Sequence, residues 1–108
     1  MTTRVLNVRD YKPYSKYWTA PPTNPYVYIG RFVREKIPIS SKWGNPFAIG
    51  RNGTREEVIN KYRVYILNKP ELLRQIPLEL KGKTLGCWCK PLTCHGDVLA
   101  EIADADNN

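Results

Sequence analysis

The chain has few of the features that mark secreted, membrane-bound or disulfide-rich proteins. No apolar run approaches the roughly 20 residues that span a bilayer, and the amino terminus lacks the apolar stretch of a secretory signal. There are three cysteines, all between residues 87 and 94, and this odd, clustered set does not form the disulfide framework of a small secreted protein. We therefore expect a cytoplasmic protein with no membrane partner.

Internal repeats, low-complexity tracts, and the Walker and glycine-rich dinucleotide signatures are also absent from the sequence. The 108 residues, with 42% hydrophobic content and 11% aromatics, suit one small globular fold. We predict a single domain over residues 1–108, with an irregular segment rich in proline and tyrosine at 11–25 and a frayed tail at 106–108.

The net charge of +7 is distributed unevenly along the chain. Residues 1–55 hold ten lysines and arginines and two acids, whereas residues 91–108 hold four acids and no lysine or arginine. A basic first half is typical of proteins that meet phosphate-bearing partners, such as a nucleotide or a nucleic acid. It is equally typical of a protein that its net charge keeps in solution, so charge alone does not establish binding.

The hydrophobic pattern predicts an α/β fold: a small single-domain sandwich of a short sheet with about three helices. Runs of alternating, β-branched or aromatic residues predict strands at residues 5–8, 26–29 and 84–89. Thr54 opens a capping box with Glu57 and so predicts the first helix. A second helix is expected from Pro70 to near Pro77, and a last one from Asp97 to about Ala105.

All three cysteines and the only histidine lie between residues 87 and 95. Because side chains alternate along a strand, Cys87 and Cys89 are expected on one face and Trp88 on the other, in the core. Cys94 and His95 stand at the entrance of the last helix, where the helix dipole favours anions and gives Cys94 thiolate character. Asp97 is placed to cap this helix or to orient His95.

Four interpretations of this cluster remain open. Zinc bound by Cys87, Cys89, Cys94 and His95 would complete a tetrahedral site. Alternatively, the three cysteines would hold an iron–sulfur cluster with one iron open. Without metal, Cys94 would act as a nucleophile with His95 or Asp97 as proton-transfer partner, or the cysteines would only line a small core. We favour a zinc or iron–sulfur cofactor, because every cysteine and the only histidine share one short window.

The strand, loop and helix at the end of the chain are arranged like the place where open α/β sheets bind anionic ligands. The lysines and arginines between residues 31 and 55, with Arg31 and Lys42 as the first candidates, are expected to hold a phosphate, and Gly96 would let a ligand approach the backbone. Further basic residues interleave with aromatic rings from Tyr11 to Trp43. This pattern is typical of surfaces that bind single-stranded nucleic acid, and also of rings that only staple an irregular segment onto a sheet.

The run from Cys87 to Leu99, read as Cys-Trp-Cys-Lys-Pro-Leu-Thr-Cys-His-Gly-Asp-Val-Leu, resembles the signature of the family catalogued as domain of unknown function 4326. Residues 28–30 and 43–47 resemble a second landmark of that family. Its members are short proteins frequent in phage and bacterial genomes, which implies the cytoplasm of a bacterial or phage-infected cell. The resemblance also implies that Asn45 and the Cys/His run form one ligand-binding site, and it carries no established activity.

Two functions follow from these observations. In the first, an enzyme uses an open metal or cluster at the cysteines to act on a nucleotide-like substrate. In the second, a structural zinc braces the final strand and helix of a module that binds nucleic acid through its basic face.

Overall fold

Three short β-rich segments form a parallel sheet in the computed structural model, which describes residues 2–18, 25–31, 33–34, 36–38 and 41–105. The strands are β1 (Arg4–Asn7), β2 (Tyr26–Tyr28) and β3 (Thr84–Cys87), in the order β1-β3-β2. Both pairings to β3 are parallel, so all three carboxyl ends lie at one edge of the sheet. The predicted small α/β sandwich is confirmed.

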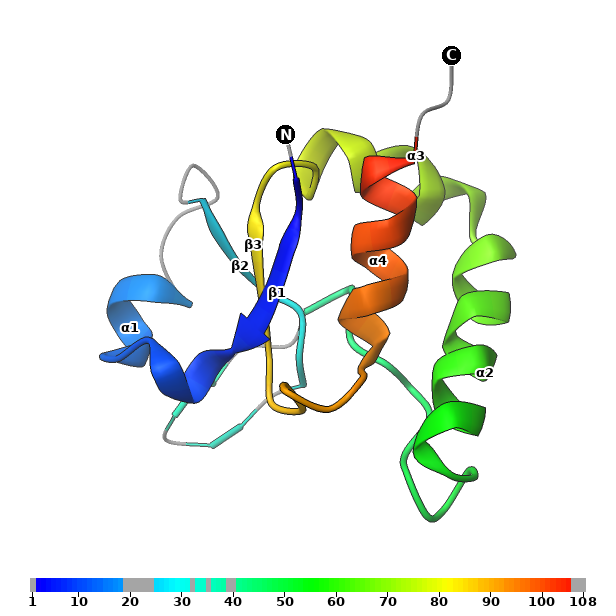
Figure 1. The fold of residues 1–108 in the computed structure, drawn as a ribbon, viewed down its shortest axis with the longest axis horizontal. Coiled ribbons are helices and arrows are strands. Elements are labelled where there is room, and N and C mark those ends of the chain that lie inside the picture. The colour runs from blue at the N-terminus through cyan, green and yellow to red at the C-terminus, as the bar shows by residue number, and fades with distance from the viewer. Residues whose placement is uncertain (1, 19–24, 32, 35, 39–40, 106–108) are drawn as a thin grey trace.

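Three helices cover one face of the sheet: α2 (Arg55–Leu67), α3 (Pro70–Glu79) and α4 (His95–Asp104) (Figure 1). The predicted capping box opens α2, because Glu57 N–H donates to Thr54 Oγ1 at 3.2 Å and Thr54 N–H donates to Glu57 Oε1 at 2.9 Å. None of the helices in the described residues is long and apolar enough to cross a membrane.

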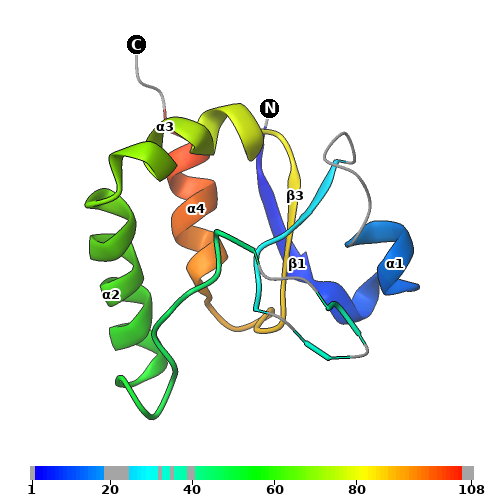
Figure 2. The same cartoon turned by 180° about the vertical axis from the view of Figure 1, so that it is seen from behind.

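The opposite face of the sheet carries a 3-10 turn, η1 (Val8–Asp10), and a one-turn helix, α1 (Tyr14–Tyr17). Both views of the ribbon show α1 on the far side of the sheet from α2 and α4 (Figures 1 and 2). Gly86 in β3 makes room here: a Cβ at this position would lie 2.4 Å from the ring of Trp18. The glycine therefore lets an indole lie directly against the central strand.

Two separate hydrophobic clusters result from these two faces. The helical-face core joins buried residues of α2, α3 and α4 to the sheet, among them Tyr62, Ile76, Leu85 and Leu99. The aromatic cluster on the other face is built on four buried residues and the rings packed around them: Val8, Trp18, Tyr28 and Ile37, with Tyr11, Tyr14, Tyr17, Tyr26 and Trp88. The alternation of strand side chains assigns Cys87 to the first cluster and Trp88 to the second, as predicted.

Several predicted boundaries were wrong. The strand expected at 84–89 ends at Cys87, because the chain turns there and Leu92 N–H bonds to the Cys89 carbonyl. Cys89 nevertheless packs against the same core as Cys87, on the face opposite Trp88, as predicted. Pro77 lies inside α3, which continues to Glu79 and is followed by a bond from Leu80 N–H to the Ile76 carbonyl.

The start of the last helix and the end of the first strand also differ from the prediction. The last helix begins at His95, two residues before the expected start, because Cys94 caps it. Val8 leaves the first strand to begin η1, and the irregular segment at 11–25 contains the one-turn helix α1. Residues 19–24 of that segment and the tail at 106–108 lie outside the described residues.

Candidate functional site

A cavity of about 490 Å³ lies at the carboxyl ends of β2 and β3. Its walls come from four segments far apart in the sequence: the chain just after β2, the loop at 45–49, the first turns of α2, and the Cys/His run at 87–95. Asn45 and Phe47 thus share one cavity with Cys87, Cys94 and His95. The meeting of these two motifs, which the family resemblance implied, is confirmed.

Two of the three cysteines form a close pair in the wall of this cavity. Cys87 ends β3, Cys94 caps α4, both side chains are buried, and their Sγ atoms lie 3.1 Å apart. The hydrogen bond from the Cys94 thiol lowers the pKa of Cys87 to about 6, against the effect of burial and together with the backbone N–H groups of Cys89 and Lys90. The bond to Cys87 and burial raise the pKa of Cys94.

The hydrogen-bonded pair therefore carries one thiolate, with the pKa of Cys87 lowered and that of Cys94 raised. The thiolate character expected at Cys94 itself stays a prediction. The helix N-terminus does act on Cys94, since Gly96 N–H donates to its Sγ at 3.2 Å. This single bond does not outweigh the burial of Cys94 and the negative charge on Cys87.

His95 and Asp97 make different contacts from those of a catalytic pair. The His95 ring is buried against Tyr62, with ring centroids 4.9 Å apart, and its Nε2 lies 2.8 Å from the Ile29 carbonyl oxygen. Burial lowers the pKa of His95, so the ring is neutral and Nε2–H donates to this carbonyl. Asp97 accepts from Cys94 N–H at 3.0 Å and pairs with Lys90 Nζ at 2.6 Å, which confirms its predicted capping role.

The structure brings together only part of the candidate metal set. Within the described residues, no group of three or more histidine, cysteine, aspartate or glutamate side chains is arranged to hold a metal ion. Cys87 and Cys94 converge, Cys89 lines the cavity after the turn, and His95 Nε2 meets a backbone carbonyl. The zinc or iron–sulfur cofactor stays a prediction.

Two arginines of the cavity wall tie its segments together. Arg31 donates from Nε and Nη2 to the Asn45 carbonyl at 3.0 and 2.8 Å, and from Nη2 to the Phe47 carbonyl at 3.0 Å. Arg55, the first residue of α2, donates from Nη1 to the Thr93 carbonyl at 3.0 Å. A guanidinium has five N–H groups, so each arginine keeps donors beyond those that these carbonyls accept.

The remaining candidate ligand-binding residues divide between the cavity and other places. Asn45 lines the cavity, but its side chain accepts from Phe47 N–H at 2.9 Å and donates to the Val58 carbonyl at 3.3 Å, so it shapes the loop. Lys42 does not line the cavity, because its ammonium group bonds to Gln75 and Glu79 of α3.

Gly96 does not line the cavity and lies on the side of α4 that faces the sheet. A Cβ at this position would lie 2.7 Å from Ile29 and 2.8 Å from Val5, so the glycine permits close packing of α4. Arg55 belongs to the basic residues between 31 and 55 that were expected to hold a phosphate, and it lines the cavity. Sequence reasoning assigned Trp88 to the core and omitted it from the ligand-binding set, although it lines the cavity as well.

Comparisons with known proteins identify the family to which the chain belongs. The family model of the domain of unknown function DUF4326 matches residues 12–105. Uncharacterized protein R718 of Acanthamoeba polyphaga mimivirus is 45% identical over 87 aligned positions, which cover 70% of this chain and 65% of that protein. An uncharacterized 12.4 kDa protein in the nrdA-td intergenic region of Enterobacteria phage T4 is 35% identical over 66 positions, covering 57% of this chain and 59% of that protein.

The matched stretch thus spans less than two thirds of the length of both viral relatives. No solved structure matches the chain significantly. The family match extends from the irregular segment before β2 through α4 and includes the whole Cys/His run. The chain belongs to the DUF4326 family.

Proposed function

We propose that the protein binds a small phosphate-bearing ligand of the nucleotide type in the cavity at the carboxyl ends of β2 and β3. The observation that carries this proposal is the position of the cavity in the sheet. β2 and β3 are neighbours in the sheet, and the chain leaves the carboxyl end of each toward the helical face, through α2 and α3 after β2 and through α4 after β3. The cavity lies outside these carboxyl ends, which is where α/β sheets bind ligands.

The chemistry of the walls suits a ligand with a charged end and an apolar body. Arg31 and Arg55 supply positive charge and fixed N–H donors. Phe47, Val58 and Trp88 supply apolar surface against which a base or sugar packs. The volume of about 490 Å³ lies within the roughly 300–1,000 Å³ common for small-molecule sites.

The proposal is tested by ligand-induced thermal stabilisation and calorimetry on the full chain. The ligands are inorganic phosphate, nucleoside mono-, di- and triphosphates, and the corresponding nucleosides without phosphate. We expect the phosphorylated compounds to raise the Tm and the nucleosides to have much less effect. Arg55→Ala should weaken binding about tenfold or more, the loss of one charge-assisted contact.

The matched control is Arg63→Ala, which removes an arginine from the same helix. Arg63 pairs with Glu101 at 2.7 Å and does not line the cavity, so its loss should leave ligand affinity unchanged. Equal weakening by Arg55→Ala and Arg63→Ala would indicate a general charge effect and would contradict the proposal. The proposal would also be contradicted if none of the phosphorylated ligands binds.

The expected zinc or iron–sulfur cofactor is a separate hypothesis about the same cavity wall. Elemental analysis and a visible spectrum of anaerobically purified protein test it. Stoichiometric colourless zinc would support a structural site, and iron with a coloured chromophore would support a cluster. Cys94→Ser should lose either metal, whereas protein free of metal after reconstitution would exclude both.

A further inference from the structure

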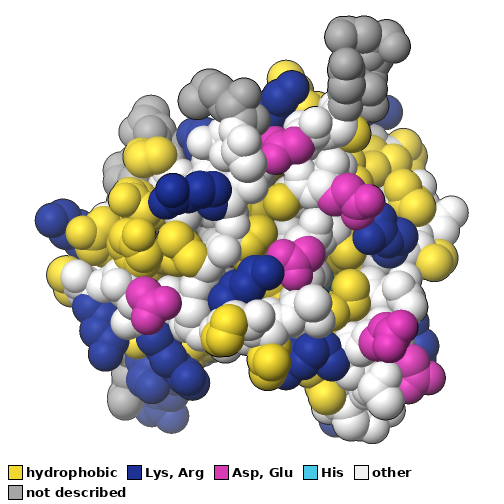
Figure 3. Space-filling model, viewed as in Figure 1, with side chains coloured by type: hydrophobic (Ala, Val, Ile, Leu, Met, Phe, Trp, Pro, Cys, Tyr) yellow, Lys and Arg dark blue, Asp and Glu magenta, His cyan; other side chains and the backbone are white. Residues whose placement is uncertain are grey.

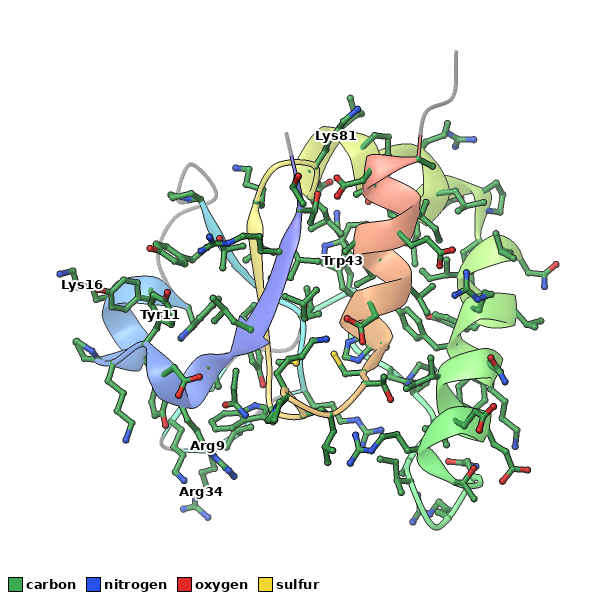
Figure 4. The ribbon with its side chains drawn as sticks, in the orientation of Figure 1. Arg9, Tyr11, Lys16, Arg34, Trp43 and Lys81 are labelled. Carbon is green, nitrogen blue, oxygen red and sulfur yellow. The ribbon has the colours of Figure 1, made fainter. Side chains whose placement is uncertain are left out.

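The face of the sheet opposite the helices carries a surface that the proposed ligand site does not use. We call it the aromatic–basic surface, and it consists of five rings and four cations: Tyr11, Tyr14, Tyr17, Tyr26 and Trp88, with Arg9, Lys12, Lys16 and Arg34. Figure 3 shows hydrophobic side chains gathered over α1, with lysine, arginine and one acidic side chain beside them. Figure 4 shows Tyr11 and Lys16 at α1, and Arg9 and Arg34 pointing outward from the same end of the molecule.

The rings of this surface are held in place but remain partly exposed. Tyr11 packs edge-on to Tyr17 with centroids 5.5 Å apart, and Tyr14 packs edge-on to Trp88 at 5.8 Å. Trp18 lies buried beneath them against Gly86 and is 2% exposed. A ring fixed by such contacts loses little conformational entropy when a flat ligand stacks on its remaining surface.

Cations lie over the same rings. Arg9 stands 5.5 Å from the centre of the Trp88 ring, Lys12 stands 6.0 Å from that of Tyr14, and Lys16 stands 5.4 Å from that of Tyr17. The ion pairs among the described residues involve other cations: Lys42 and Lys90, which lie in loops, and Arg63 of α2. Residues 9–18 hold three cations and one acid, so this stretch of the chain carries a net positive charge.

We propose that the aromatic–basic surface binds single-stranded nucleic acid. A single strand repeats a phosphate and an unpaired base at every nucleotide, and this surface repeats a cation and a part-exposed ring. A duplex hides its base faces, and its base edges are commonly read by an α-helix or a two-stranded β-ribbon in the major groove. The helix on this surface, α1, has four residues and is too short for that role.

This inference does not rest on the proposed ligand site, although the two surfaces meet. Trp88 packs on Tyr14 and also lines the cavity, so a strand bound on the aromatic–basic surface would extend to the cavity. Arg31 and Arg55 belong to the cavity wall and are not part of this surface. Mononucleotide binding and oligonucleotide binding can therefore fail independently.

Fluorescence anisotropy with a labelled 20-nucleotide oligo-dT tests the proposal on the full chain. The test variant is Lys12→Glu/Lys16→Glu, and the matched control is Arg74→Glu/Lys81→Glu, in and after α3. All four side chains are exposed, and both variants lower the net charge of +7 by the same amount. Urea unfolding of both variants verifies that each is folded under the binding conditions.

We expect the unaltered protein to bind the oligonucleotide at 50 mM salt, with affinity falling steeply as salt rises. The Lys12→Glu/Lys16→Glu variant should bind about tenfold or more weakly, and the control should change about threefold or less. Tyr14→Leu, which removes a stacking ring and keeps an apolar side chain, should weaken binding about tenfold with little change in salt dependence.

Three results would overturn the proposal. The first is no binding of the oligonucleotide at low salt. The second is equal weakening in the test and control variants, which would assign the effect to net charge alone. The third is a preference for a duplex of equal length, or for vesicles with anionic headgroups over the oligonucleotide, which would assign the surface to another partner.

Discussion

The two faces of the sheet are built from different side chains and have different consequences. The helical face is closed by aliphatic residues such as Ile66, Ile76 and Leu99, which are 0% exposed. The other face is closed by aromatic residues, several of which keep part of their ring in solvent. The side chains of the helical-face core are fully used in stabilising the fold. The rings of the aromatic cluster leave part of their surface exposed, where a partner can contact it.

The two faces meet at the carboxyl end of β3. Cys87 belongs to the helical-face core and pairs with Cys94, while the next residue, Trp88, belongs to the aromatic cluster. Trp88 Nε1–H donates to the Tyr28 hydroxyl at 2.8 Å, which fixes the indole on that side. Both of these neighbours line the cavity, so both faces contribute to its walls.

The largest effect should come from a cavity in the helical-face core. Leu99→Ala removes a side chain that is 0% exposed, and we expect a loss of about 2–5 kcal/mol in the free energy of unfolding. Urea unfolding followed by circular dichroism measures it. Leu78→Ala in α3, at a position 82% exposed, is the control and should change stability by no more than about 0.5 kcal/mol. Equal losses would contradict the assignment of stability to this core.

A smaller loss is expected from crowding the aromatic cluster. In Gly86→Ala the new Cβ meets the Trp18 ring at 2.4 Å, so we expect about 1–3 kcal/mol of destabilisation. The same urea unfolding measures it. Adding Trp18→Leu should recover part of this loss, because the two changes act on one contact. Purely additive losses would show that Trp18 does not rest on Gly86.

Removal of the α2 cap should lower the free energy of unfolding by less than either of these two changes. Thr54→Ala deletes the oxygen that accepts from Glu57 N–H, and we expect a loss of about 1 kcal/mol. Thr54→Ser keeps the oxygen and should stay within a few tenths of a kcal/mol of the unaltered protein. Since Arg55 follows this cap and lines the cavity, ligand affinity should fall together with stability in Thr54→Ala.

The last prediction has a spectroscopic readout and concerns the cysteine pair where the two faces meet. The ultraviolet absorbance of a thiolate should appear as pH rises through about 6 and be lost below it, because the lowered pKa of Cys87 keeps this thiol ionised at neutral pH. Cys94→Ala removes the hydrogen-bond donor, so the transition should move toward the ordinary thiol pKa of about 8.5.

Cys89→Ala is the matched control for this titration. It deletes a cysteine side chain two residues from Cys87 and keeps the bond between Cys87 and Cys94, so the transition should stay near its original pH. A transition that moves in Cys89→Ala but not in Cys94→Ala would assign the thiolate to a different pair.

Much of the secondary structure follows from the sequence, because its signals are local. Each of these signals acts only on residues that are a few positions away in the chain. They are the capping box at Thr54, the proline that opens α3, and the aromatic and β-branched run before Ile29. The turn after Cys87 was missed because an apolar or aromatic run continues past the last paired residue. Pro77 was misread as a helix end because the buried Ile76 and Leu80 on either side of it keep this part of the chain packed against the core.

The sequence by itself determined the α/β class, the main helices and the window that holds every cysteine and the only histidine. Only the tertiary structure decided that β3 is central, that Cys94 pairs with Cys87, that Lys42 turns to α3 and that Arg55 reaches the cavity. The physical reason is the distance along the chain between the residues that interact. Helix caps and strand patterns depend on neighbours in the chain, whereas strand pairing and cavity walls depend on contacts between residues tens of positions apart.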